Sequence, residues 1–183
     1  MAFHRPHSLL FLQLLLVLLI YKSEASECHP PPGEHLIREI CDDSQHVDLC
    51  VSSLKADPRA SQVCINKMGP AVVSIVRNNA TDTRSYVYLL LNQATNPAAK
   101  ACLAACYKNY KFAVRDLRAA VKESKDYDRF GSVLSRLTLV RSNVTECEAG
   151  FRKGNAASPL TRRNRNVVQL AEVADVIISD LMV

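Results

Sequence analysis

Histidine and tryptophan are the residue types whose scarcity is most informative in this sequence of 183 residues. It has no tryptophan, and the last of its five histidines is His46. A di-metal centre in a helical bundle needs inward-facing Glu-x-x-His pairs, and most nucleophilic sites need a histidine base. Of the histidines outside the N-terminal leader, His29, His35 and His46, none lies in a ligand cluster, and no serine lies in a nucleophile elbow. We therefore expect exposed histidines, no metal, no cofactor and no enzymatic activity.

Two further absences limit the fold and the partners. No stretch alternates apolar and polar residues over the length of a strand, which favours an all-helical protein. The formal net charge is +5, but no run of lysine and arginine is dense enough to predict nucleic-acid binding. There is also no internal repeat and no low-complexity tract.

The one long apolar run, Leu9–Tyr21, lies near the N-terminus. It follows a short basic start and precedes Ser23 and Ala25, which occupy the −3 and −1 positions of a cleavage site. This order predicts a secretory signal peptide over residues 1–25, because the run is short for a membrane span; the alternative is an uncleaved signal anchor. Residues 26–183 are then enough for one domain with a hydrophobic core.

The centre of the chain, Ala98–Cys147, predicts two antiparallel helices. Apolar residues recur at steps of three and four on both sides of a polar turn, Glu123–Arg129, in which Asp126 is placed as a helix N-cap. The two sets are Leu103, Cys106, Tyr110, Ala113, Leu117 and Ala120, then Phe130, Val133, Leu137, Val140, Val144 and Cys147. Cys106 and Cys147 are equidistant from the turn, so we expect them to form a disulfide.

A smaller helical hairpin is predicted near the N-terminus. Two short helical segments, Glu34–Asp42 and Val47–Lys55, flank a turn, and Cys41 and Cys50 lie symmetrically about it. The same geometry predicts a second disulfide between these two cysteines. A metal site is disfavoured, because a secreted protein meets oxidising conditions and eight residues separate the cysteines.

Four helix-start signals divide the rest of the chain. Asp57-Pro58, Asn96-Pro97 and Ser158-Pro159 each place a capping residue before a proline, and Asp126 is the fourth. The first helix is expected over residues 58–93, with a kink at Pro70, an interruption near Asn78–Arg84, and Ile65, Met68, Val72, Ile75, Tyr86 and Leu90 inward. The last is expected over residues 159–182, with Val168, Ala171, Ala174, Ile178 and Leu181 inward. Short connections then predict an up-down-up-down four-helix bundle, preceded by the short N-terminal helical hairpin.

Three cysteines and two glycosylation sequons remain. We expect Cys64 and Cys102 to be buried and reduced, and Cys28 to be available for an intermolecular disulfide. The sequons begin at Asn79 and Asn143, and a secreted chain could carry a glycan at each. Asn79 is favoured over Asn143, because the residue after Asn143 belongs to the core set.

These features together resemble the plant invertase and pectin methylesterase inhibitors. The likeness extends over roughly residues 36–182 and depends on three segments in combination. They are the Cys41–Cys50 spacing followed by Val-Ser-Ser-Leu-Lys-Ala-Asp-Pro-Arg, the segment Leu117–Tyr127, and Cys147-Glu-Ala-Gly-Phe. The resemblance implies a four-helix bundle after a helical hairpin, with the same two disulfides, and a protein partner that is a plant carbohydrate-active enzyme.

The resemblance also implies a target-binding segment. Invertase inhibitors carry Pro-Lys-Phe at the turn between the second and third bundle helices, and this tripeptide enters the active site of the enzyme. Here the turn reads Asp128, Arg129 and Phe130. The favoured hypothesis is a secreted inhibitor of acid invertase, in the apoplast or the vacuole, in which Arg129 and Phe130 occlude the sucrose pocket. On the alternative interpretation of these residues, Phe130 is simply the first core residue of its helix.

Two other functions stay open at this level. The first is inhibition of pectin methylesterase, in which a face of the bundle covers a polysaccharide cleft and the turn matters less. The second is a small-ligand or storage bundle, which the large, regular core residues disfavour.

Overall fold

The computed structural model describes residues 34–61 and 67–182. The predicted leader, Cys28, His29, Cys64 and Ile65 lie outside these residues. The described part consists of the elements α2 (Glu34–Cys41), α3 (Val47–Ala56), α4 (Pro58–Ser61), α5 (Met68–Gln93), α6 (Pro97–Glu123), the 3₁₀ turn η2 (Tyr127–Arg129), α7 (Phe130–Lys153) and α8 (Thr161–Asp180). No strand occurs among them, and no helix is long and apolar enough to cross a bilayer.

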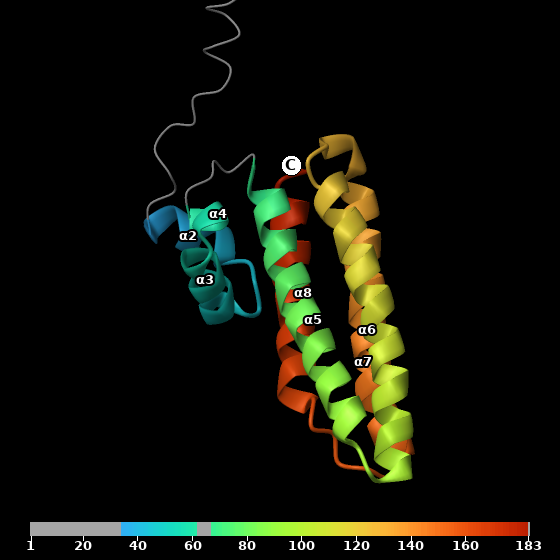
Figure 1. Ribbon diagram of the computed structural model, residues 1–183. Helices are drawn as coiled ribbons and strands as arrows, with labels where there is room; N and C mark the ends of the chain where they lie inside the picture. The colour runs from blue at the N-terminus through green and yellow to red at the C-terminus, as the bar shows by residue number, and fades with distance from the viewer. Residues whose placement is uncertain (1–33, 62–66, 183) are drawn as a thin grey trace, which may run out of the picture.

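The four long helices form an antiparallel bundle, and α2–α4 lie at one side of it beside α5 and α8 (Figure 1). In the bundle α6 packs between α5 and α7, while α8 packs on α5 and α7. This confirms the predicted all-α class and the up-down-up-down order with its N-terminal hairpin. One end of the bundle carries the α6–α7 turn, and the other end carries the α5–α6 and α7–α8 connections.

The capping signals position the helix starts for identifiable reasons. Asn96 accepts a hydrogen bond from the Ala99 amide at 3.1 Å, with Pro97 in the first turn of α6. Asp126 caps η2 by accepting from the Asp128 amide, so α7 begins four residues after the predicted cap. Ser158 accepts from the Leu160 amide, and α8 begins at Thr161.

The prediction for the first bundle helix was wrong in three respects. The long helix does not begin at Pro58, because α5 begins at Met68 with Lys67 as its N-cap residue, and Pro58–Ser61 form the separate element α4. Pro70 therefore lies in the first turn of α5, where its missing N–H removes no hydrogen bond and produces no kink. The expected interruption near residues 78–84 is also absent, since α5 runs unbroken through that segment.

The inward faces of α5 and α8 are rotated from the predicted ones. In α5 the fully buried side chains include Val76, Ala80 and Val87, while Ile75, Tyr86 and Leu90 are only partly buried. In α8 the buried set includes Val167, Leu170 and Ile177, while Val168 and Leu181 lie at the edge. Met68, Val72, Ala171, Ala174 and Ile178 are buried as predicted.

Both predicted disulfides are present in the structure. Cys41 and Cys50 join α2 to α3, and Cys106 and Cys147 join α6 to α7 near the end away from their connecting turn. Every member of the two predicted core sets is buried. Cys102 is free and half-buried, with its Sγ 3.6 Å from the Gly150 carbonyl oxygen, so the prediction of a reduced thiol is confirmed and that of full burial is not.

The N-terminal hairpin is attached to the bundle by both apolar and polar contacts. Ile37 and Leu54 are buried with the bundle core. His46 Nε2 lies 2.8 Å from a carboxylate oxygen of Glu172 on α8. The expectation of an exposed His46 was therefore wrong, since this histidine links the hairpin to α8, whereas His35 is almost fully exposed.

Candidate functional site

The α6–α7 turn is the most exposed polar segment that joins two bundle helices and is the first candidate site. The chain leaves α6 at Glu123, forms the one-turn η2 and continues directly into α7. Tyr127 is 53% exposed, and Asp128 and Arg129 also face solvent. The turn therefore presents an aromatic ring, a carboxylate and a cation in three consecutive residues.

Phe130 is not part of that exposed set. It is 2% exposed and packs in the core at the start of α7, with its ring centroid 4.9 Å from that of Tyr127. Phe130 is therefore a core residue of α7, as in the alternative interpretation, and its entry into a target enzyme stays a prediction. Tyr127 supplies the exposed ring instead. The sequence analysis did not select Tyr127 as a site residue. The signal was present, because Phe130 is in register with the core residues of its helix and Tyr127 is not.

Arg129 is held only weakly within the turn. Its Nε lies 3.7 Å from a carboxylate oxygen of Asp126, and both side chains are more than half exposed. Such an exposed pair contributes about 0–1 kcal/mol, so the guanidinium can exchange Asp126 for another carboxylate at low cost. The Asp128 side chain makes no ion pair within the described residues.

A charged cluster secures the base of the turn. Glu123 accepts hydrogen bonds from Arg136 at 2.6 and 2.9 Å and from the Ser132 hydroxyl at 3.0 Å. The hydrogen bonds from Arg136 are the main reason why the pKa of Glu123 lies below its usual value. Arg136 also lies 3.8 Å from the buried carboxylate of Asp116, which Arg115 contacts at 3.1 Å. These bonds connect the last turn of α6 to the first two turns of α7.

The start of α5 packs closely against the same turn. A Cβ atom on Gly69 would lie 3.2 Å from the Ser124 carbonyl oxygen and 3.1 Å from Cδ1 of Ile178. Glycine at this position therefore lets α5 approach the turn and α8 together. The result is a rigid platform below Tyr127 and Arg129.

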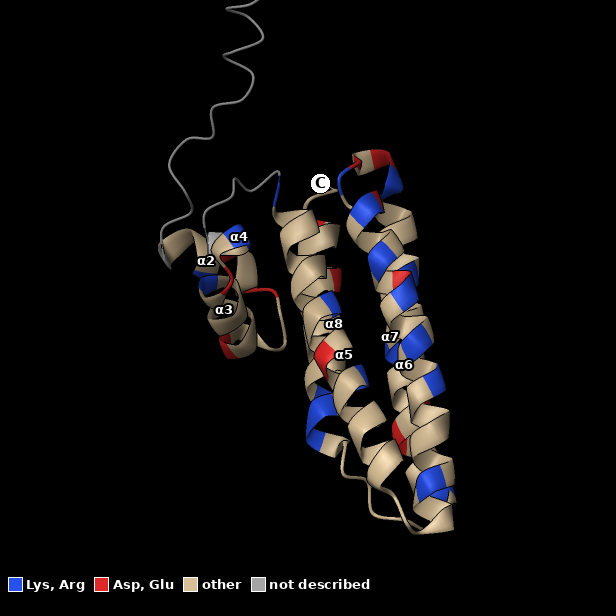
Figure 2. Ribbon diagram, in the orientation of Figure 1, with Lys and Arg blue, Asp and Glu red and all other residues tan. Residues whose placement is uncertain are grey.

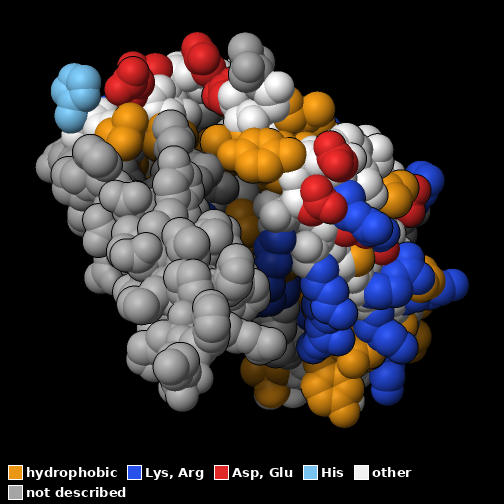
Figure 3. All heavy atoms as spheres, turned by 90° about the horizontal axis from the view of Figure 1, so that it is seen from above, with side chains coloured by type: hydrophobic (Ala, Val, Ile, Leu, Met, Phe, Trp, Pro, Cys, Tyr) orange, Lys and Arg blue, Asp and Glu red, His pale blue; other side chains and the backbone are white. Residues whose placement is uncertain are grey.

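A groove of about 500 Å³ lies beside this platform. Its floor is mainly apolar, and three cations line its edge; the lining residues are Arg59, Lys67, Pro70, Ala71, Ser74, Val121, Ser124 and Lys125. Figure 3, which looks onto this end of the molecule, shows basic side chains gathered on one side and acidic ones along another edge. The turn and the groove together form one candidate surface for a protein partner.

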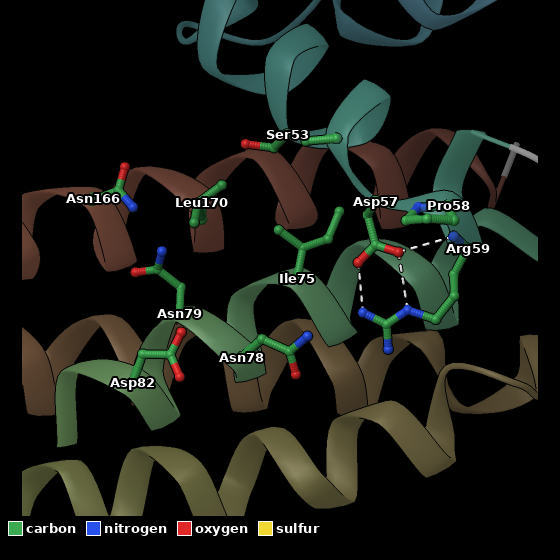
Figure 4. A pocket seen from close by; sticks show the side chains of 11 residues that line it. Ser53, Asp57, Pro58, Arg59, Ile75, Asn78, Asn79, Asp82, Asn166 and Leu170 are labelled. Carbon is green, nitrogen blue, oxygen red and sulfur yellow. Dashed lines mark hydrogen bonds and ion pairs between the residues drawn. The ribbon is translucent and has the colours of Figure 1, made fainter. Parts of the chain in front are cut away.

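A second recess, of about 420 Å³, lies between the segment Ser53–Arg59 and the helices α5 and α8 (Figure 4). Asp57 lies at one end and accepts hydrogen bonds from the Arg59 side chain, which lower the pKa of its carboxyl group. Asn79 from α5 and Asn166 from α8 line the recess farther along, so its walls are rich in amide groups. The described residues contain no group of three or more His, Cys, Asp or Glu side chains placed to hold a metal ion.

Both sequons lie within helices, and glycosylation stays a prediction for each. Asn79 is half-exposed at the second recess. Asn143 is also half-exposed, but its Nδ2 donates a hydrogen bond to the Leu139 carbonyl oxygen at 2.8 Å. The atom that would carry the glycan is therefore engaged at Asn143, in agreement with the preference for Asn79.

Comparison with known proteins places this architecture in a family. A model of the family described as plant invertase/pectin methylesterase inhibitor matches residues 35–177, and the chain belongs to this family. A pectinesterase inhibitor of Actinidia deliciosa is 29% identical over 180 residues, which cover 97% of this chain and 95% of that protein. An Arabidopsis thaliana protein named cell wall / vacuolar inhibitor of fructosidase 1 is 27% identical over 140 residues, covering 75% of this chain and 65% of that protein.

A solved structure shares the fold. The crystal structure of mutant form A of a pectin methylesterase inhibitor from Arabidopsis aligns with a TM-score of 0.66 at 15% sequence identity, covering 76% of this chain and 93% of that one. The family is one of protein inhibitors of enzymes, in agreement with the expectation of a chain without catalytic activity. The names of the relatives divide between the two target enzymes.

Proposed function

We propose that this chain is a secreted inhibitor of acid invertase that covers the active site of the enzyme with its α6–α7 turn. The observation that carries the proposal is the exposure of both Tyr127 and Arg129 in one short turn on a rigid platform. A retaining glycosidase places two carboxyl groups at the bond it cleaves, and a guanidinium pairs well with a carboxylate. Arg129 therefore has the charge, and Tyr127 the ring, that such a pocket can accept.

Inhibition by this mechanism needs no chemical step on the inhibitor. The bundle acts as a rigid body, so little conformational entropy is lost when the turn enters the enzyme. Asp128 opposes this binding, because its negative charge would lie beside the same acidic pocket. The balance between Arg129 and Asp128 is therefore the feature of the turn that sets the affinity.

Inhibition of pectin methylesterase is the second candidate. It is favoured by the likeness to a pectinesterase inhibitor along almost the entire chain. In that mode a broad face of the bundle would cover the polysaccharide cleft of the enzyme, and the exposed turn would contribute little. The two candidates therefore predict different responses to the same substitutions in the turn.

The test is a set of inhibition constants against one acid invertase and one pectin methylesterase, from acidic to neutral pH. Arg129→Ala should weaken inhibition of invertase by about 2–5 kcal/mol, the usual effect of truncating a buried, paired cation. Asp128→Asn should strengthen inhibition, most of all near neutral pH. Arg162→Ala removes an exposed arginine at the other end of the bundle and serves as the matched control.

If Arg129→Ala inhibits invertase as strongly as the unchanged protein does, the turn is not the element that blocks the active site. Strong inhibition of pectin methylesterase alone would establish the second candidate.

Secretion is a further part of the proposal. The predicted leader, residues 1–25, would direct the chain to the cell wall or the vacuole, and two disulfides in a small domain suit such compartments. N-terminal sequencing of the protein recovered from plant tissue should give Ser26 or a neighbouring residue. A full-length chain that stays in the membrane fraction would contradict the proposal.

A further inference from the structure

The outer face of α6 carries a regular row of cations, which we call the basic stripe. It consists of Lys108, Lys111, Arg115, Arg118 and Lys122, which follow one another at steps of three and four residues. All five are exposed. At 1.5 Å per residue the stripe is about 21 Å long, with a positive charge about every 5 Å along the helix axis. Figure 2 shows these basic residues following one another along α6.

No other element of the described structure covers the basic stripe. The opposite face of α6 carries the core residues Leu103, Tyr110 and Leu117, and α5 and α7 pack against that side. Of the five cations, only Arg115 has an ion pair within residues 34–61 and 67–182. Its partner, Asp116, is buried and also close to Arg136, so it does not neutralise the stripe.

This arrangement has a cost for the helix. Like charges three or four residues apart repel one another, by about 0.2–0.5 kcal/mol for each pair. The stripe contains four such neighbouring pairs, and none is relieved by an acidic residue on the exposed face of α6. Within the described chain only the pair of Arg115 with Asp116 offsets part of this repulsion, and a partner of opposite charge would relieve the rest.

The side chain of Phe112 adds an apolar contact within the stripe. It is 37% exposed, with Lys108 Nζ 6.0 Å from the ring centroid and the Arg115 guanidinium carbon 5.2 Å from it. A flat ring between cations can pack against the C–H face of a sugar while the cations bind carboxylates on the neighbouring sugars. The stripe therefore fits a chain that is both charged and built of sugar rings.

We propose that the basic stripe binds a linear polyanionic polysaccharide, a polymer of uronic-acid sugars with one carboxylate on each ring. The choice of ligand rests on the second candidate function, since a pectin methylesterase converts methyl esters of a polysaccharide into such carboxylates. Charge complementarity carries the rest of the argument. The surface lies on the outer face of α6, whereas the proposed enzyme-binding residues Tyr127 and Arg129 lie at its end.

The test measures binding to polygalacturonate by the full mature protein. Fully methyl-esterified polymer is the uncharged probe, and a DNA duplex is the alternative polyanion. Binding to polygalacturonate should be seen at low salt and weaken steeply at higher salt, because exposed charges are screened. The esterified polymer should not bind, and DNA should bind more weakly than polygalacturonate.

The variant Lys111→Gln/Arg118→Gln/Lys122→Gln removes three charges that make no ion pair in the described structure. We expect its affinity for polygalacturonate to fall by about tenfold or more, in proportion to the exposed contacts removed. The control Lys153→Gln/Arg162→Gln/Arg165→Gln changes the net charge equally at the other end of the bundle and should lose less than about twofold. Because like charges are removed, the stripe variant should melt at the same or a slightly higher temperature.

Inhibition of invertase, measured with neutral sucrose, should be the same for the stripe variant and the unchanged protein. Failure of this inference is thus separable from failure of the proposed function, which the variants of the turn test. The inference is overturned if polygalacturonate does not bind at low salt, or if the control variant loses as much affinity as the stripe variant. Equal binding of the esterified polymer, or tighter binding of DNA, would overturn it as well.

Discussion

Asn164 is one of the few polar side chains that the bundle buries, and its amide connects three helices. Its Nδ2 donates a hydrogen bond to Glu148 at 2.6 Å, and its Oδ1 accepts one from the Tyr110 hydroxyl at 2.8 Å. Glu148 also accepts from Ser158 and Thr161, so the cluster secures the α7–α8 connection. Burial raises the pKa of Tyr110 well above its usual value, so this phenol is a permanent donor.

Truncation of this side chain should therefore destabilise the protein. Asn164→Ala removes a partner from both Tyr110 and Glu148, and we expect the free energy of unfolding to fall by about 2–3 kcal/mol. Urea denaturation followed by circular dichroism measures this change. Asn166→Ala, two residues away and half-exposed, should change it by less than about 0.5 kcal/mol. Equal effects of the two substitutions would mean that the buried hydrogen bonds contribute little.

The exposed ring of the turn can be tested against a closely matched tyrosine. Tyr127 and Tyr88 are both 53% exposed, and each packs against one other aromatic ring, Phe130 and Tyr107 respectively. Tyr88 lies near the end of α5 that is far from the turn. Tyr127→Ala should raise the inhibition constant for invertase by about tenfold, as for an aromatic residue central to an interface. Tyr88→Ala should leave it unchanged, and a similar loss for both would indicate a general effect on the fold.

The two helical hairpins differ in how strongly their disulfides should stabilise them. Cys106 and Cys147 are separated by 41 positions in sequence, whereas Cys41 and Cys50 are separated by 9. In the chain-entropy description the longer loop contributes about 4 kcal/mol and the shorter one about 3 kcal/mol. The α6–α7 disulfide is therefore expected to matter more for the stability of the whole bundle.

Paired substitutions should reproduce that order. Cys106→Ala/Cys147→Ala should lower the urea midpoint more than Cys41→Ala/Cys50→Ala does, with the fold checked by circular dichroism. If the Cys41→Ala/Cys50→Ala variant folds, its inhibition constant would show whether the α2–α3 hairpin contributes to target binding. A larger effect from the pair near the N-terminus would contradict the loop-length argument.

At the same scale, the sequence predicted the α6–α7 hairpin better than α5. Both halves of the hairpin repeat apolar residues at core spacing, and symmetric cysteines fix the register. In α5, apolar residues such as Ile75, Val76 and Leu90 occur on several faces, so spacing alone does not select the buried one. The start of α5 was missed because Asp57 does cap a helix, by accepting a hydrogen bond from the Arg59 amide, but that helix is the four-residue α4.

The candidate site was predictable in position but not in its details. The family likeness and the polar turn both indicated residues 126–130. Which ring is exposed depends on η2, a single 3₁₀ turn that places Tyr127 outward and Phe130 inward. The basic stripe was missed because its cations are dispersed in the sequence and become neighbours only on a helix.

For the whole molecule, acidic groups with opposite pKa shifts determine the stability at low pH. Hydrogen bonds from Arg59 and Arg136 lower the pKa of Asp57 and Glu123. For Glu148, burial raises the pKa of the carboxyl group, but hydrogen bonds from three side chains lower it by more. The pKa of Glu148 is therefore also below its usual value. Above the pKa values that these groups have in the unfolded chain, their carboxylates stabilise the fold. This contribution is lost as the pH falls through their lower pKa values in the folded protein.

Asp175 and Asp180 act in the other direction. Burial raises the pKa of both, and the raised value means that protonation favours the folded state. Their contribution therefore increases as the pH falls from neutral through the raised pKa values. Together the two sets predict a broad stability maximum at mildly acidic pH and a decline below about pH 4, near the unfolded pKa of glutamate.

Glu123→Gln tests the sign of this prediction. At neutral pH we expect the variant to be less stable by about 1.5–3 kcal/mol, because it loses charge-assisted hydrogen bonds to Arg136. The difference should shrink as the pH falls below the unfolded pKa of glutamate and through the lowered pKa of Glu123, where this carboxylate is protonated in the unchanged protein. Urea midpoints measured across this range give the result, with Glu146→Gln on the exposed side of α7 as control. A difference that stays constant with pH would contradict the argument.

The disulfide between α6 and α7 also determines what happens if the exposed turn is cut by a protease. Lys125 and Arg129 are exposed cleavage positions for a trypsin-like enzyme. The Cys106–Cys147 bond lies about 25 Å from the turn along the helices. A cut at either residue therefore separates the backbone into two pieces that stay covalently joined and remain packed in the bundle. The chain would be cut within the proposed target-binding turn, yet it would release no fragment until a reductant opens the disulfide.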